Sequence, residues 1–160
     1  MTQHDTEAIA LRDEERELVV LELDALLPAL RGERRARYEQ LREATAAGSV
    51  PAELARPLES LLELTLQTAR ARQLYRAEGE RILTDLFRRT PGGRELARHL
   101  GDVNTALRSL AGHRLESATV RMRTLGHFTV TISTDAATIT LAIRPEGVNV
   151  DSVSVGGSGG

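Results

Sequence analysis

The sequence predicts an α+β protein in which a long helical region precedes a small antiparallel sheet. Up to about residue 112, apolar residues recur at steps of three and four, which is the spacing of amphipathic helices. After Arg114 they alternate with polar residues, which is the spacing of strands with one buried face. We therefore expect an N-terminal region of long, coiled-coil-like helices, followed by one helix packed on a four-stranded antiparallel β meander.

This change of period divides the chain of 160 residues into parts. We expect a helical oligomerisation region at residues 1–89, a helix with a four-stranded β module at residues 90–155, and a flexible glycine-rich tail at residues 156–160. The sequence leaves open whether the tail is native or an added linker.

The first helix is expected over residues 6–30, with Asp5 as its N-cap. Pro28 should disturb its last turn, and Gly32 should end or bend it. A short arginine-rich helix over residues 33–47 follows, and the segment at residues 48–51 indicates a clear break.

Residues 51–89 have a helical pattern throughout, and one helix of this length would span about 58 Å. Such a long helix needs a partner, so we interpret its apolar seam as the interface of a homo-oligomer. Gly79 interrupts the seam, which predicts either a kink or the close approach of a second helix. The candidate interface residues are Leu61, Leu64, Tyr75, Ile82 and Leu86.

A new helix is expected after Thr90, because threonine caps helices and Pro91 suits the first helical position. Its apolar seam is the most regular in the chain, and Gly112 should end it. The seam consists of Leu96, Leu100, Val103, Leu107 and Leu110.

Four strands with short turns between them follow, so adjacent strands should pair antiparallel. One face of the sheet is apolar, and the other is rich in threonine and arginine. The apolar face needs a cover, and the helix that ends at Gly112 is the nearest element that can supply one.

Charge is unevenly distributed, although the net charge is only −2. Residues 1–30 hold eight acidic residues against two arginines, whereas residues 70–98 hold eight arginines against four acidic residues. These two helical regions can therefore attract each other, within a monomer or across a dimer. All 21 basic side chains are arginines, so the chain has no lysine that could act as a nucleophile.

Motifs for catalysis or for a cofactor are missing from the sequence. It contains no cysteine, and its four histidines lack the spacing of a metal site. The start of the helix at Pro91, Gly92, Gly93 and Arg94 could accept a phosphate, but a plain helix break explains it better. We therefore expect no enzyme activity, no cofactor and no metal.

The predicted function is that of a non-enzymatic scaffold, adaptor or assembly protein that oligomerises through its helices and presents the β module to a protein partner. No apolar run is long enough for a membrane span and no signal peptide is evident, so we expect a cytoplasmic location. The alternative is a nucleic-acid-binding protein that uses arginines of the long helix and the polar sheet face. Its candidate contacts are Arg70, Arg72, Arg76, Arg81, Arg88, Arg89, Arg121 and Arg123.

Overall fold

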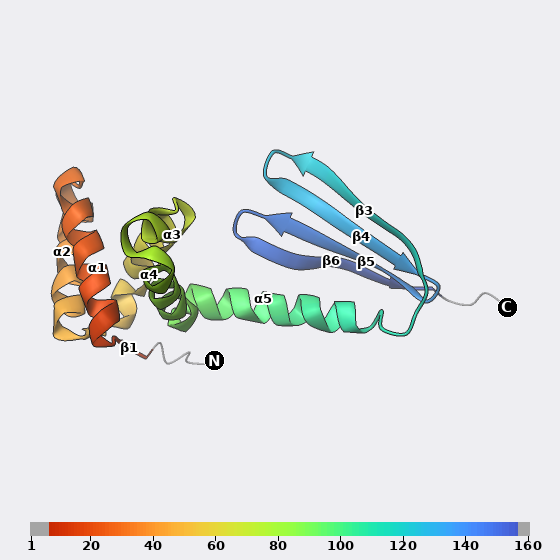
Figure 1. Cartoon of the computed structure of the whole chain (residues 1–160), viewed down its shortest axis with the longest axis horizontal. Coiled ribbons are helices and arrows are strands. Elements are labelled where there is room, and N and C mark those ends of the chain that lie inside the picture. The colour runs from red at the N-terminus through yellow and green to blue at the C-terminus, as the bar shows by residue number, and fades with distance from the viewer. Residues whose placement is uncertain (1–6, 157–160) are drawn as a thin grey trace. The chain divides into compact units, whose positions relative to one another are not determined.

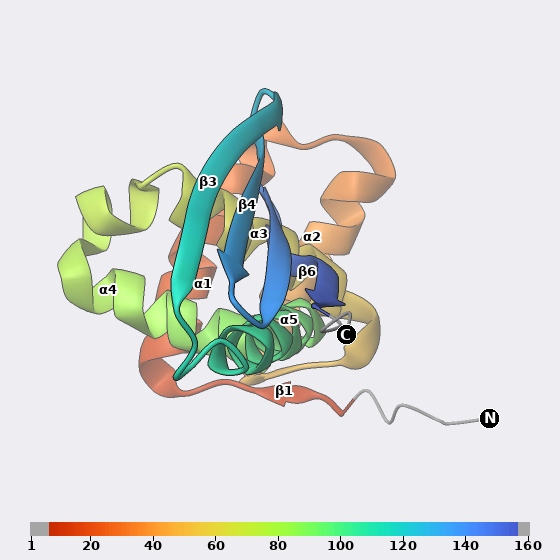
Figure 2. The same ribbon diagram turned by 90° about the vertical axis from the view of Figure 1, so that its right-hand side faces the viewer.

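Residues 7–156 are described by a computed structural model, which confirms the α+β class (Figures 1 and 2). Five α-helices precede a four-stranded antiparallel sheet in this part of the chain. The chain forms two compact units, Met1–Arg94 and Glu95–Gly160. Their boundary lies within helix α5 (Pro91–Arg108), shortly after the division predicted at residue 90.

The first helix starts later than predicted. Residues Ile9–Ala10 form a short strand, β1, which pairs antiparallel with β2 (Ser49–Val50). Ile9 is only 6% exposed in the core of the first unit, so burial of its side chain favours strand pairing over helix at this point. Helix α1 spans Asp13–Leu26, and the predicted cap at Asp5 lies outside the described residues.

The next elements largely follow the prediction. A 3-10 turn, η1 (Leu27–Ala29), contains Pro28 and ends the first helix, and α2 spans Gly32–Ala47. Gly48 terminates α2 in the left-handed conformation with φ 89°, which glycine adopts without the strain that a Cβ would cause.

The single long helix predicted over residues 51–89 is wrong. A 3-10 turn, η2 (Ala52–Leu54), leads into α3 (Ala55–Gln67), and α4 (Arg70–Arg89) starts after a break at Ala69, where φ is +57°. Helices α3 and α4 fold back on each other. Much of the apolar face that was expected to require another chain is thus buried within one chain, including Leu61 and Leu86.

The predicted kink near Gly79 is present inside α4. Arg76 has φ 61° and ψ −166°, which breaks the helix geometry. A Cβ atom on Gly79 would lie 2.1 Å from the Cβ of Tyr75, whereas the Cβ atoms of residues four apart in a regular helix are about 5–6 Å apart. Glycine at position 79 therefore permits a close approach within the same helix.

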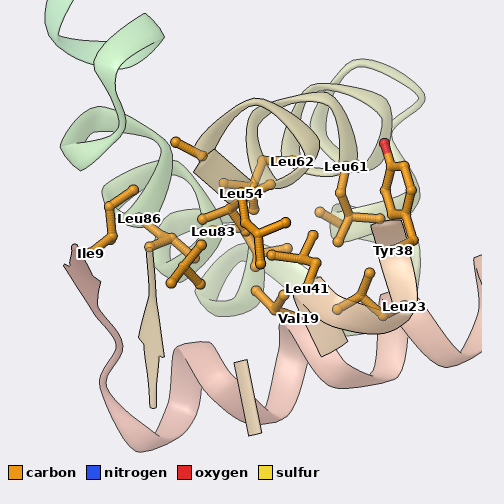
Figure 3. Packing of buried hydrophobic residues seen from close by; sticks show 14 of the residues in the cluster. Ile9, Val19, Leu23, Tyr38, Leu41, Leu54, Leu61, Leu62, Leu83 and Leu86 are labelled. Carbon is orange, nitrogen blue, oxygen red and sulfur yellow. The ribbon is translucent and has the colours of Figure 1, made fainter. Parts of the chain in front are cut away.

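One apolar cluster holds the first unit together (Figure 3). It is built almost entirely from aliphatic side chains, and Tyr38 is its one buried aromatic residue. Its most deeply buried large side chains are Val19, Leu23, Leu41, Val50, Leu58, Leu62, Leu83 and Leu86.

The second unit contains the predicted meander, with strand order β3-β4-β5-β6 and antiparallel pairing throughout. Gly126 in the turn between β3 and β4 and Gly147 at the start of β6 have positive φ. The strands are β3 (Leu115–Thr124), β4 (His127–Thr134), β5 (Ala137–Arg144) and β6 (Gly147–Val155).

The predicted cover of the apolar sheet face is confirmed for part of that face, including Ile139 and Leu141 of β5. Ile139 and Leu141 of β5 are 0% and 6% exposed, and the C-terminal half of α5 packs over this face. The contacts come from Val103, Ala106 and Leu107 of α5 and from Leu110 in the turn that follows the helix.

Candidate functional site

The opposite charges of α1 and α4 pair within the chain. Glu22 of α1 accepts a hydrogen bond of 2.8 Å from Nε of Arg70, and Glu15 of α1 accepts one from Nη2 of Arg89. Both glutamates are buried, with 4% and 1% of their surface exposed. Of the two arrangements left open by the sequence, the structure thus contains the pairing within a monomer.

Glu22 is the centre of a polar network in the first unit. Its Oε1 accepts a hydrogen bond of 2.5 Å from the hydroxyl of Tyr75, and its Oε2 also accepts one of 3.2 Å from Thr65. Burial, followed by the hydrogen bond to Glu22, raises the pKa of Tyr75 to about 12, so the hydroxyl remains a donor even at alkaline pH where an ordinary tyrosine loses its proton. Both carboxylate oxygens accept hydrogen bonds, so the network joins α1, α3 and α4.

Backbone strain lies next to both α4 residues that bind Glu22. Ala69 precedes Arg70 and Arg76 follows Tyr75, and each has a positive φ that a side chain disfavours. A pocket of about 250 Å³ adjoins Glu22 and Arg70, with an otherwise largely apolar lining. We interpret the two contacts to Glu22 as what holds the strained start of α4 in place.

The start of α5 is already occupied by a carboxylate. The backbone N–H of Gly92 donates a hydrogen bond of 2.6 Å to Oε1 of Glu59, which is 8% exposed, and Thr90 caps the helix by accepting one from the N–H of Gly93. An anion at Pro91–Gly92–Gly93–Arg94 would have to displace Glu59. This excludes the phosphate interpretation of that segment in the conformation described and confirms the predicted helix start.

Most of the candidate arginines on α4 are engaged by acidic side chains. Besides Arg70 and Arg89, Arg81 lies 3.3 Å and Arg88 lies 3.0 Å from the carboxylate of Asp85, and Arg72 lies 3.8 Å from Glu80. Arg76 is at the kink. The helix therefore lacks a continuous stripe of free guanidinium groups.

The arginines of the sheet, in contrast to most of those of α4, are not paired with acidic side chains of the described residues. Arg121, Arg123 and Arg144 form no ion pair with any of residues 7–156. Arg121 pairs in register with Thr129, which pairs with Ala142, so these positions share the polar face. A pocket of about 220 Å³ at this end of the sheet has a lining without acidic residues among those described; it includes Arg123, Thr124, His127, Thr129 and Arg144.

Metal and membrane sites have no support in the described part of the chain. Residues 7–156 contain no group of three His, Asp or Glu side chains placed to hold a metal ion. His113 instead lies 3.3 Å from Asp135, at the start of the sheet. None of the helices over the same residues combines the length and the apolar character of a membrane span.

The apolar sheet face is covered unevenly. At Ile139 and Leu141 of β5 it is buried. On the edge strand β3, Val120 is 66% exposed and Met122 is 63% exposed, and Ala118 beside them is exposed as well. These three residues share one face, in register with Val130, Phe128 and Ile132 of β4. Together they form what we call the β3 patch: Ala118, Val120 and Met122.

Most of the residues predicted to form the oligomer seam pack inside the first unit. Leu61 and Leu86 are 2% and 0% exposed in its core, and Tyr75 packs against that core while it binds Glu22. Ile82 is half-buried, and Leu64 is 49% exposed at the edge of the pocket beside Glu22. An oligomer through these five residues stays a prediction, and the buried ones could join it only if the core opened.

Comparison with known protein families, curated proteins and solved structures finds no match. The function therefore has to be inferred from the geometry.

The sequence predicts that the β module presents a binding surface or an edge strand, but it does not place that surface on β3. It predicts one apolar sheet face and one helix to cover it, without indicating which strand that helix leaves exposed. The alternation of residues is the same on β3 and β5, so it carries no signal that separates a covered strand from an exposed one.

Proposed function

We propose that this chain is a non-enzymatic protein-interaction module whose sheet binds a protein partner through β3. The observation that carries this proposal is the exposure of the β3 patch on a strand with a free edge. Exposed apolar side chains that lie together on one strand favour burial against another protein. A location in the cytoplasm remains part of this proposal.

A free edge adds a second mode of recognition. An edge strand presents unpaired backbone N–H and C=O groups, to which an extended segment of a partner can add as a further strand. In β3 this edge runs beside the patch, so one partner can use both backbone hydrogen bonds and apolar contacts. The first unit, with its internal ion pairs, then serves as a stable scaffold and not as the oligomerisation region that the sequence predicts.

The test compares two acidic substitutions at neighbouring residues on opposite faces of β3. Val120→Asp places a charge in the patch, whereas Thr119→Asp places the same charge on the polar face. We expect Val120→Asp to weaken binding of a protein partner at least about tenfold and Thr119→Asp not to weaken it. The full chain is used to capture partners from a lysate, which are then identified and purified. Each purified partner is titrated against the original chain, Val120→Asp and Thr119→Asp.

Folding of the variants is checked by thermal unfolding. Because Val120 is 66% exposed, its replacement should change the free energy of unfolding by only about 0.5 kcal/mol. Equal binding of a purified partner to both variants and the original chain would rule out the patch as the contact surface.

Nucleic-acid binding remains the second candidate function, and one observation favours it on the sheet. Arg121, Arg123 and Arg144 have no acidic partner among the described residues and share the threonine-rich face. Fluorescence titration with single-stranded RNA and DNA should then show affinity that falls steeply with salt and with Arg121→Gln and Arg123→Gln, but not with Arg88→Gln. Binding that responds to neither salt nor these changes would end this alternative.

A further inference from the structure

The β3 edge fits one partner especially well, namely a second copy of itself. We propose that two copies of this chain pair antiparallel through β3, with the two-fold axis at Val120, and join their sheets into one. The inference rests on the proposed function, because it names the partner that the β3 patch would bind.

The two edges of the sheet differ in how well they can accept another strand. The pairing of β3 with β4 is regular from Ser117 to Met122, and its irregularities lie at the two ends. In β6 the register shifts in the middle of the strand, where Asp151 is an extra residue opposite Thr140 and Leu141. A bulge of this kind interrupts the row of backbone groups and protects an edge from pairing. The regular edge is therefore β3.

The register follows from the side chains. Residues that oppose each other across an antiparallel pair lie on the same face. With the two-fold axis at Val120, the two Val120 side chains face each other and Ala118 faces Met122 of the other copy. The two β3 patches then form one continuous apolar surface, and the arrangement closes after two copies, as an isologous interface requires.

Charge argues against the neighbouring registers. An axis at Arg121 would set the two Arg121 guanidinium groups directly opposite each other, which destabilises a sheet. An axis at Thr119 would bring Glu116 level with Met122 and leave a carboxylate beside the apolar surface. With the axis at Val120, Arg121 opposes Thr119 and Arg123 opposes Ser117, so no like charges stand directly opposite each other.

The same register predicts how the dimer responds to charge. Thr119 lies opposite Arg121 of the other copy, so Thr119→Asp creates two new opposite-charge pairs and should tighten the dimer by roughly threefold to tenfold. Val120→Asp puts two carboxylates face to face at the axis and should abolish it. The two Arg121 side chains are diagonal neighbours, so added salt should strengthen the association of the original chain.

The chain contains no cysteine, which allows a direct test of the register. Single variants Val120→Cys, Thr119→Cys and Arg121→Cys of the full chain are oxidised under the same conditions and analysed without reductant. At the axis, the Cα atoms of the two residues 120 lie about 4.5–5.5 Å apart, which suits a disulfide. The two residues 119, like the two residues 121, are diagonal neighbours in this register and lie too far apart for a disulfide. We expect Val120→Cys to form a covalent dimer at least tenfold faster than the other two.

Sedimentation velocity of the unmodified chain gives the second readout. At about 100 µM a dimer with a Kd near 1 µM is almost fully associated, so the original chain and Thr119→Asp should sediment as dimers and Val120→Asp as a monomer. A monomeric original chain would overturn the proposal, and so would faster crosslinking at residue 119 or 121. If the chain is a monomer but Val120→Asp still loses a purified partner, the proposed function stands and only the second copy is excluded.

Discussion

Replacing Gly93 with alanine is expected to lower the free energy of unfolding by about 3 kcal/mol. A Cβ atom at this position would lie 1.9 Å from the carbonyl oxygen of Phe87 and 2.7 Å from the Cα of Arg88. Both are backbone atoms, so no side chain can rotate away, and the turn between α4 and α5 must shift. The shift would also disturb the hydrogen bond from Gly92 to Glu59. Chemical denaturation followed by circular dichroism measures the loss.

Gly101 supplies the matched control, because it lies in the same helix and a Cβ there would meet no atom within 4 Å. Gly101→Ala should stabilise the protein by roughly 0.5–1 kcal/mol, since alanine favours the helix over glycine. If Gly93→Ala is as stable as Gly101→Ala, the close approach of Gly93 to the backbone of Phe87 and Arg88 is contradicted.

Replacing Leu86 with alanine is expected to cost between about 2 and 5 kcal/mol, because it leaves a cavity in the core of the first unit. Leu86 is fully buried there, near Leu83 and Ile9 (Figure 3). The cost should be independent of protein concentration, since the lost contacts are within one chain. Denaturation at two protein concentrations that differ tenfold measures the loss of stability and shows whether it depends on protein concentration.

Leu64→Ala is the companion variant, taken from the same predicted seam but from an exposed position. We expect it to cost about 1 kcal/mol or less. Equal and concentration-dependent losses for Leu86→Ala and Leu64→Ala would favour the interchain seam that the sequence predicts and contradict the internal core.

The two seams predicted in the helical region show why periodicity alone is ambiguous. Val103, Leu107 and Leu110 were assigned to a helix face that covers the sheet, and they do cover it. Leu61 and Leu86 were assigned to an interface between chains, yet both lie inside one unit. Spacing shows that a face is buried, but it does not show whether the covering element belongs to the same chain. The break at Ala69 decides this, because it lets α4 turn back onto α3.

Some contacts of the candidate site could be predicted from the sequence, and others could not. Acidic and basic helices predicted an attraction, and the structure contains it as the pairs Glu22–Arg70 and Glu15–Arg89. The use of Glu59 to occupy the start of α5 had no signal in the sequence, because Glu59 and Gly92 are 33 residues apart. Contacts between residues so far apart depend on the path of the chain between them.

By itself, the sequence determined the α+β class, the position of the helical region before the four-stranded meander, and the turn at Thr90 that starts α5. These features depend on local periodicity, on capping and on the conformational freedom of glycine, which act over a few residues. Only the tertiary structure decided that the long helix is broken, that most candidate arginines of α4 are paired, and that the β3 patch is exposed. Each of these depends on which surfaces meet, and burial is a property of the packed chain and not of any segment.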